Sequence, residues 1–329
     1  MAQPNLQSFK QRAVAIALRA AGTPGVAVVP TAAANGVMLF NGQSGTEFDK
    51  VERAIDRTFF TNDPFSIGLR RAFIEGEFEL YPPATPGAAA TSDADCGVLL
   101  LPAGMTAVKT LASKTTRYNP ISQGIPISDA YFWHAGLLKK CDAARHDISA
   151  LTLSVGERFK GRVRVQGGYL DISEQALPAV VLPQTVPVIA RADNTVAKID
   201  VLPVGGAVNV WAKSLSVDFG NDIKTKEYTE TRQTGIDSRK AKWTMRIAKT
   251  ALADFNPWLT RDSATPLVAS FRLKETSSLR YSELGIRGQI EQINEVDIDG
   301  DYGWELSGPC IASDAGGDEF YIEFGDATP

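Results

Sequence analysis

The stretch that decides the fold is RRAFIEGEFEL, residues 70–80. From Ile74 onward its even-numbered positions are apolar or glycine. Its odd-numbered positions carry three glutamates, Glu75, Glu77 and Glu79. A period of two is that of a β-strand with one face buried and the other face in water.

The second half of the chain repeats this pattern with the opposite charge, in RKAKWTMRIAK at residues 239–249. Trp243 and Ile247 fall on one face of this strand, and lysines and arginines occupy the other face. In each half the charged strand follows a polar segment, and the polar segment follows an apolar stretch, at residues 37–40 and 215–219. We therefore expect an all-β module that occurs twice in the chain. Such a repeat is more typical of a protein that assembles with copies of itself than of an enzyme.

The composition is that of a soluble globular protein, with 329 residues of which 44% are hydrophobic and 22% charged. The formal net charge of −4 gives no general attraction for nucleic acid or for an anionic membrane surface. Lys10, Arg12 and Arg19 interrupt the first apolar residues, which argues against a secretory signal or a membrane span there. The three cysteines are an odd number without C-x-x-C spacing, and they predict reduced thiols in a protein made in a cytosol.

Two hairpins are predicted from alternating residues on either side of a short turn. The first covers residues 147–170 and turns at Gly156-Glu157. The second covers residues 288–306 and turns at Asp299-Gly300, a pair that is favoured where both turn residues need a positive φ. A last strand is expected at residues 319–324.

The domain boundaries are predicted from the prolines. Four prolines interrupt short valine-rich pieces in residues 171–210, and proline cannot donate to a β-ladder. The predicted organisation is a first module with an N-terminal arm at residues 1–175, a proline-rich linker at residues 176–205, and a second module at residues 206–329.

The beginning of the chain is ambiguous. Residues 6–20 fit one face of a helix and one face of a strand equally well. Residues 22–45 are rich in Gly, Pro, Ala and Thr, and they predict extended or looped chain with one short strand near its end.

The sequence contains none of the common nucleotide-binding, serine-hydrolase or zinc-protease motifs. His134, Cys141 and His146 could in principle bind zinc, but they lack a fourth ligand at a usual spacing. We predict no enzyme activity, no catalytic residues, no cofactor and no metal site.

Three other charged groups have simpler explanations than a site. The acidic residues of 295–301 resemble a calcium loop, but a tight turn between two strands explains them better. The three glutamates of residues 70–80 could be paired carboxylates of a glycosidase, although one charged strand face is usually only solvated. The basic residues of 224–249 surround Trp243, yet the alternation places the tryptophan and the cations on opposite faces, which favours a solvated or intersubunit face over a nucleic-acid platform.

The order of segments resembles that of the tail tube proteins of long-tailed bacteriophages, in particular the two-module type. The matching segments of the first half are RAVAIALRAAGTPG (12–25), RRAFIEGEFEL, GVLLLPAGMTAVKT (97–110), Tyr118-Asn119-Pro120 and DAARHDISALTLSVGERFKGRVRVQGGYL (142–170). Those of the second half are SLSVDFGNDIKTKEY (214–228), with Phe219-Gly220-Asn221, and QINEVDIDGDYGWELSGP (292–309).

This resemblance implies a mainly β fold of two β-sandwich or partial-barrel modules, each with a small helix. It implies a structural virion protein that stacks as rings into the tail tube, the conduit for genome ejection. The implied partners are further copies of the chain, a tape-measure protein, a tail terminator and distal tail proteins, with DNA passing through unbound and no membrane. The implied location is the virion tail, assembled in the host cytoplasm. The alternatives are a tail terminator or baseplate hub, or a carbohydrate-binding or hydrolytic β-sandwich.

Two candidate surfaces follow for such an assembly. The first is the acidic face of Glu75, Glu77 and Glu79, which we expect to line the channel because three like charges on one strand need good solvation. The second is a pair of arms at residues 53–68 and 224–238, which are longer than usual hairpin loops and are expected to dock on the adjacent ring. Their candidate contact residues are Arg57, Phe59, Phe60, Lys226, Tyr228 and Arg232. Two modules per chain favour three chains in a pseudo-sixfold ring over six chains.

Overall fold

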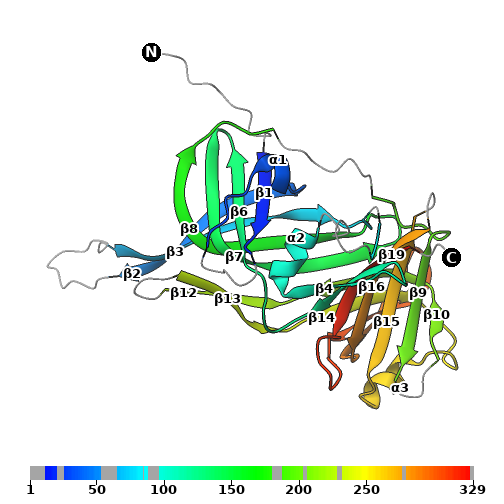
Figure 1. Ribbon diagram of the computed structural model, residues 1–329. Helices are drawn as coiled ribbons and strands as arrows, with labels where there is room; N and C mark the ends of the chain where they lie inside the picture. Colours follow the sequence, from blue (N-terminus) through cyan, green and yellow to red (C-terminus); the bar gives the residue numbers. More distant parts are fainter. Residues whose placement is uncertain are drawn as a thin grey trace.

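The protein is described by a computed structural model that covers residues 12–20, 26–52, 65–83, 85–87, 96–179, 187–202, 206–227, 232–275 and 279–326. The fold is mainly β, as the alternating patterns predict. The strands form three antiparallel sheets, and the helices are short (Figure 1).

A ten-stranded sheet runs through the centre of the molecule. Its continuous path contains β17 (Gln292–Ile298), β18 (Asp301–Pro309), β14 (Lys242–Ala248), β11 (Ala212–Asp218), β7 (Leu137–Ser154), β8 (Lys160–Glu174), β3 (Phe65–Glu79) and β2 (Phe40–Glu52), in that order. Two further strands, β6 (Ser128–His134) and β1 (Arg12–Leu18), extend it from β7.

A seven-stranded sheet packs beside it. Its order is β10 (Val208–Val210), β9 (Thr195–Val201), β15 (Leu267–Lys274), β16 (Arg280–Gly288), β19 (Phe320–Asp326), β5 (Thr115–Pro120) and β4 (Met105–Thr110). A separate ribbon pairs β12 (Asn221–Glu227) with β13 (Arg232–Arg239). The helices are α1 (Ala32–Asn35), α2 (Gly97–Leu100), the 3-10 turn η1 (Leu101–Ala103) and α3 (Pro257–Asp262).

One order of four strands occurs twice in the ten-stranded sheet. The path β2-β3-β8-β7 is followed directly by β11-β14-β18-β17. In each four-strand unit the first two strands are joined through a projection at one end of the sheet, and the last two form a hairpin that turns at the other end. The projections are the distal part of β2–β3 and the β12–β13 ribbon, and both extend to the same side of the molecule (Figure 1).

A large core lies between the two large sheets, and a smaller cluster around Trp133 packs β1 and β6 against α1. Trp243 and Met245 of β14 point into the large core from one side, and Phe271 and Phe324 from the other, and all four are buried. Burying side chains of this size contributes about 1.5–3 kcal/mol each. The alternation that the sequence shows in both charged strands is therefore the division between this core and the outer face of the ten-stranded sheet.

The two halves of the chain share both large sheets. Strand β7 pairs with β11, where Leu153 stands opposite Leu215. Strand β19, the last in the sequence, pairs with both β16 and β5. The division into sequential modules with a linker at residues 176–205 is not confirmed, since β9 lies inside that range and is an interior strand between β10 and β15.

The N-terminal region differs from the sequence-based expectation. The ambiguous residues 6–20 contain strand β1, so the helical alternative is wrong for its described part. The short strand expected at residues 37–40 is not formed: residues 37–39 are irregular chain between α1 and a long β2 that begins at Phe40. Glycines had suggested a loop here, but a Cβ on Gly45 would lie 2.4 Å from the Phe73 ring, so this glycine instead lets an aromatic side chain cross the strand.

The two predicted hairpins and the last strand are confirmed. Strands β7 and β8 turn around Gly156, whose φ is 92°. Strands β17 and β18 turn at Asp299 and Gly300, with φ of 55° and 95°. Both values are positive, as the Asp-Gly pair predicts for this type of tight turn.

Candidate functional site

The acidic stripe lies on the outer face of the ten-stranded sheet, the face directed away from the core. Strand β3 carries it, and strand β8 places a cation opposite each carboxylate. The pairs are Glu75 with Arg164, Glu77 with Arg162, and Glu79 with Lys160. Ion pairs join Arg162 to Glu75 at 3.6 Å and Arg158 to Glu79 at 2.7 Å. Neighbouring cations therefore already screen the three carboxylates, and the assignment of this face to a channel stays a prediction.

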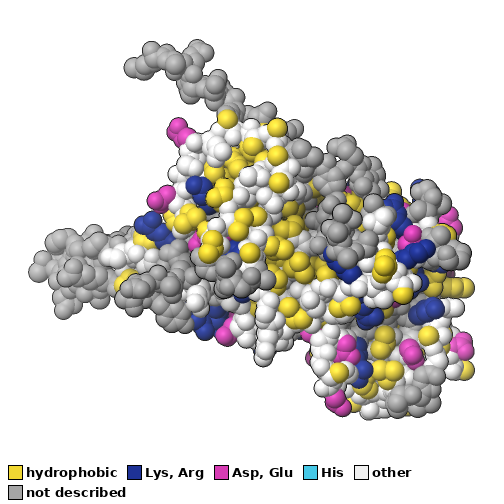
Figure 2. Space-filling model, viewed as in Figure 1, with side chains coloured by type: hydrophobic (Ala, Val, Ile, Leu, Met, Phe, Trp, Pro, Cys, Tyr) yellow, Lys and Arg dark blue, Asp and Glu magenta, His cyan; other side chains and the backbone are white. Residues whose placement is uncertain are grey.

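The basic strand of the second half lies on the same face of the same sheet. Lys242 and Arg246 of β14 are exposed, whereas Trp243 between them is buried, as the alternation predicts. Arg246 donates to Glu305 of β18 at 2.6 Å. On the outer face, each of the basic strands β14 and β8 thus has carboxylates on a neighbouring strand, and Figure 2 shows both charge signs interspersed on the visible side, with hydrophobic side chains concentrated over the lobe of α1, β1 and β6.

The described residues of the two predicted arms belong to strands. Residues 65–68 of the first arm begin β3, and its residues 53–64 lie outside the described part of the chain. The second arm lies in the β12–β13 ribbon. Lys226 is exposed on β12, and Arg232 begins β13. The other candidate contact residues, Arg57, Phe59, Phe60 and Tyr228, lie outside the described residues.

The base of the second arm is held by a polar joint. The Asn221 backbone N–H donates to Asp147 at 3.0 Å, and its side-chain amide donates to the carbonyl oxygens of Ala103 and His146. Arg239, on the other strand of the arm, donates to the Asn221 side chain at 3.1 Å and to the carbonyl oxygen of Gly104 at 2.8 Å. Both strands of the ribbon are therefore fixed to the η1 turn at the point where they leave the sheet.

A glycine makes this joint possible. Gly220 has φ of 59°, and a Cβ there would lie 2.5 Å from the Lys240 carbonyl oxygen. The preceding Phe219 is buried and packs against Phe320, with ring centroids 4.5 Å apart. The segment Phe219-Gly220-Asn221 thus supplies a core anchor, a left-handed turn and a polar anchor in three consecutive residues.

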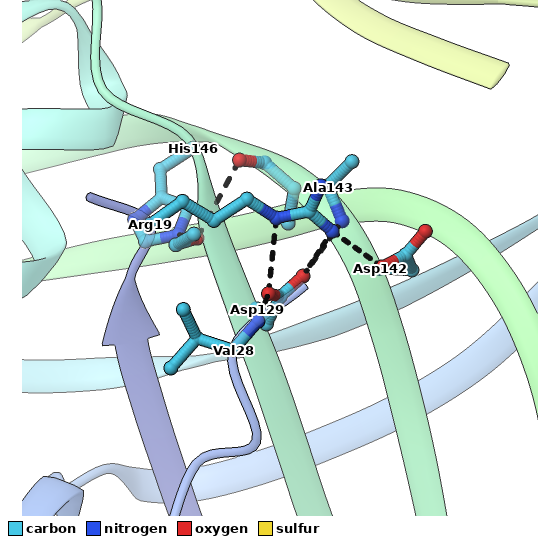
Figure 3. A network of polar contacts seen from close by, with 8 residues as sticks. Arg19, Val28, Asp129, Asp142, Ala143 and His146 are labelled. Atoms are coloured by element: carbon cyan, nitrogen blue, oxygen red, sulfur yellow. Dashed lines mark hydrogen bonds and ion pairs between the residues drawn. The ribbon is translucent and has the colours of Figure 1, made fainter. Parts of the chain in front are cut away.

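A buried ion-pair network joins β1 to β6 and β7 (Figure 3). Arg19 contacts Asp129 through two hydrogen bonds of 3.0 and 2.7 Å and reaches Asp142 at 2.5 Å. Asp129 also accepts from the backbone N–H groups of Val28 at 2.7 Å and Ala143 at 2.9 Å. Burial lowers the pKa of Arg19, but its hydrogen bond and charge pairing with Asp129 outweigh burial and raise the pKa above its usual value.

A second buried contact has the geometry of a hydrolase dyad. Ser128 Oγ lies 2.8 Å from His146 Nε2, and His146 Nδ1 lies 2.9 Å from the carbonyl oxygen of Leu99. Because a carbonyl only accepts, Nδ1 carries the proton and Nε2 accepts from the serine hydroxyl. Both side chains are fully buried, and burial lowers the pKa of His146 to about 4. The pair is sealed from solvent and connects the strands to α2.

The metal-like groups of the sequence have structural roles. Cys141 is buried and donates to the carbonyl oxygen of Ala72, and burial raises the pKa of its thiol. Asp297 accepts from Gly300 at 2.7 Å, and Asp299 pairs with Lys213 at 2.6 Å, as expected of a turn. Within the described residues, no cluster of three or more His, Cys, Asp or Glu side chains is arranged to hold a metal ion.

The local patterns of the sequence predict neither the joint nor the buried network. A partial signal for the network was present, since Arg19 directly ends the apolar run of β1 and Asp129 lies inside the apolar β6. An isolated charge among apolar residues of a buried strand calls for a partner of opposite charge. The identity of that partner depends on strand pairing, which the local pattern does not contain.

Comparison with models of known protein families and with curated proteins found no match to this chain. In the described part of the chain, none of the helices has the length and apolar character needed to cross a membrane.

Proposed function

We propose that this chain is a structural subunit of a phage tail, a tail tube protein of the two-module type, whose rings stack into a conduit for DNA. The observation that carries this proposal is the four-strand unit that occurs twice, side by side, in one sheet. A unit that already joins to a copy of itself within the chain is suited to join to further copies between chains. No catalytic step is assigned to any residue.

The open edges of the sheet support assembly into rings. The continuous path of the sheet ends at β2 on one side and at β17 on the other, and within the described residues each of these two strands pairs with one neighbouring strand. Edge strands invite association, and a cyclic arrangement of copies would join β17 of each copy to β2 of the next. The junction of β7 with β11 inside the chain is a template for the junction of β17 with β2 of the next copy.

The two units per chain favour three chains per ring. Three copies would place six four-strand units around the axis in a pseudo-sixfold ring. The outer face, with Glu75, Glu77 and Glu79, would line the channel. Carboxylates lie beside the cations of β8 and β14, which leaves no continuous basic surface, so DNA would pass without being held. The remaining proposed partners are a tape-measure protein, a tail terminator and distal tail proteins, and the proposed location is the virion tail.

Electron microscopy of the purified protein tests the proposal. We expect tubes of stacked rings with three chains per ring, measured by the mass of single rings or by the rotational symmetry of a reconstruction. Six chains per ring would overturn the trimeric arrangement. A protein that stops at one ring would instead indicate a tail terminator, and a protein that stays monomeric at high concentration would refute the proposal.

A further inference from the structure

A pocket of about 400 Å³ opens at the base of the second arm, where the chain passes from β13 to β14. One wall is the segment 239–242, and the other is the connection that leads from the end of β18 to β19. Exposed residues on both walls, Lys240 and Ala312, leave the pocket open to solvent. Its volume is within the range of small-molecule sites, which is about 300–1,000 Å³.

The lining of this pocket carries excess positive charge. Arg239, Lys240 and Lys242 contribute three cations. Among the described lining residues, Glu319 contributes the one carboxylate, 3.4 Å from Arg239, which leaves a net charge of +2. Both lysines are exposed, and in the described part of the chain neither ammonium group has a carboxylate within ion-pair distance. Asp218 stands opposite Lys242 on β11, but its carboxylate accepts from a backbone N–H of the following turn at 3.0 Å.

Contacts within the protein hold the walls of the pocket in place. Arg239 donates to the carbonyl oxygen of Gly104 at 2.8 Å. The Cys310 N–H donates to the carbonyl oxygen of Ala241 at 2.9 Å, which joins the two walls. Burial lowers the pKa of Arg239, and the charge of Glu319 opposes burial only in part. A second anion beside this guanidinium would therefore stabilise its charge.

The rest of the lining is apolar. Ala241, Pro309 and Ala312 belong to it, together with Cys310. Burial and the nearby charge of Glu319 raise the pKa of the Cys310 thiol, so the thiol stays neutral near pH 7. An apolar wall beside a group of cations suits an organic anion, because its apolar part would be removed from water while its charged part meets the lysines.

We propose that this pocket binds a phosphate monoester with a small apolar group. Such a phosphate carries a charge of about −1.5 to −2 near pH 7, which matches the net charge of the lining. Lysine ammonium groups bind phosphate as point charges, and Lys240 and Lys242 can approach its oxygens from the rim of the pocket. A carboxylate carries one charge and would leave one lysine without a partner. The pocket lies on interior strands of the sheet, β14 and β18, so this inference does not depend on the ring contacts of the proposed tube.

Isothermal titration calorimetry of the full chain with phenyl phosphate tests the proposal. We expect binding at least about tenfold tighter than that of benzoate, which has the same ring and one charge. We also expect it to be tighter than the binding of inorganic phosphate, which has no apolar part. Equal affinities for phenyl phosphate and benzoate, or no binding of phenyl phosphate at millimolar concentration, would overturn the inference.

Two double variants distinguish binding in the pocket from general attraction between charges. Lys240→Gln combined with Lys242→Gln is expected to weaken the binding of phenyl phosphate at least about tenfold. The control is Lys224→Gln combined with Lys226→Gln, which removes the same charge from two exposed lysines of β12. Equal weakening by both double variants would overturn the inference.

Ala312→Leu tests the shape of the pocket without a change of charge. Ala312 is exposed, so the larger side chain takes up space in the pocket rather than in the core. We expect weaker binding of phenyl phosphate, with an unchanged circular dichroism spectrum and an unchanged urea midpoint. Unchanged affinity in this variant would show that the phosphate binds outside the pocket and would overturn the inference.

Discussion

Replacing Arg19 by methionine is expected to destabilise the fold strongly, because this substitution keeps most of the volume and removes the guanidinium. The side chains of Arg19 and Asp129 are 6% and 4% exposed. Asp129 would keep two backbone donors, from Val28 and Ala143, but would lose its counter-charge in a place that water does not reach. Removing one partner of a buried ion pair costs about 3–5 kcal/mol.

A surface ion pair of the same composition provides the control. Arg71 and Asp49 lie 2.9 Å apart, with side chains 29% and 54% exposed. Arg71→Met is therefore expected to cost only about 0–1 kcal/mol. With a urea m-value of about 3 kcal/mol/M, Arg19→Met should lower the unfolding midpoint by about 1–1.7 M and Arg71→Met by less than about 0.3 M.

Urea unfolding followed by circular dichroism measures both midpoints. Arg19→Lys serves as a milder variant if the methionine variant does not fold, since lysine keeps the charge but lacks the two-pronged geometry. Equal midpoints for the Arg19 and Arg71 variants would refute the conclusion that the buried ion pairs of Arg19 contribute more to the free energy of unfolding than the exposed ion pair of Arg71.

Three further predictions concern separate features of the structure. Burial holds the pKa of His146 at about 4, below its usual 6.5, so the unfolded chain takes up this proton at a higher pH than the folded chain. The free energy of unfolding should therefore fall by up to about 3 kcal/mol as the pH drops from 6.5 to 4. In urea titrations at each pH, the His146→Gln variant should lack this part of the pH dependence. Gly220→Ala should lower the free energy of unfolding by about 1–3 kcal/mol more than Gly300→Ala. Both glycines have positive φ, but only a Cβ at residue 220 would meet a carbonyl oxygen. Equal urea midpoints for the two variants would contradict this expectation. Changing Glu75, Glu77 and Glu79 together to lysine should lower the free energy of unfolding by about 1–3 kcal/mol, because it places like charges opposite the cations of β8. Adding about 0.5 M salt should restore much of this stability by screening the repulsion. A loss of stability that does not depend on salt would point to another cause.

The local patterns of the sequence predicted the strands and their faces well. Trp243 was assigned to the core from alternation alone, and the Asp299-Gly300 turn from the conformational preference of two residues. These features are determined by residues that are adjacent in the sequence, so the local pattern predicts them. The loop expected from the glycines of β2 is wrong because Gly45 accommodates the ring of Phe73, which belongs to another strand and is remote in the sequence.

The pairing of the strands could not be predicted from the local patterns of the sequence. The residues Lys160, Arg162 and Arg164 show the same period as the glutamates of β3, but nothing local states that β8 pairs with β3. The same holds for Asn221 and Arg239, whose partners come from η1 and from the residues next to β5 and β19, Ile121 and Glu319. Charges on one strand can be assigned to a face from the sequence, whereas their neutralisation depends on the register of the adjacent strand.

The pairing of β19 with β5 has a consequence for synthesis of the chain. Tyr118 of β5 stands opposite Ile322 of β19, which is synthesised about 200 residues later. This edge of β5 therefore has no β19 to pair with until the end of the chain has left the ribosome. The β7 edge likewise stays open until β11 has been made. Contacts so distant in sequence form slowly, and an unpaired edge is prone to wrong association meanwhile. Nascent chains should therefore depend on chaperones until release, and a chain truncated before residue 320 should accumulate as aggregate rather than as a smaller folded domain.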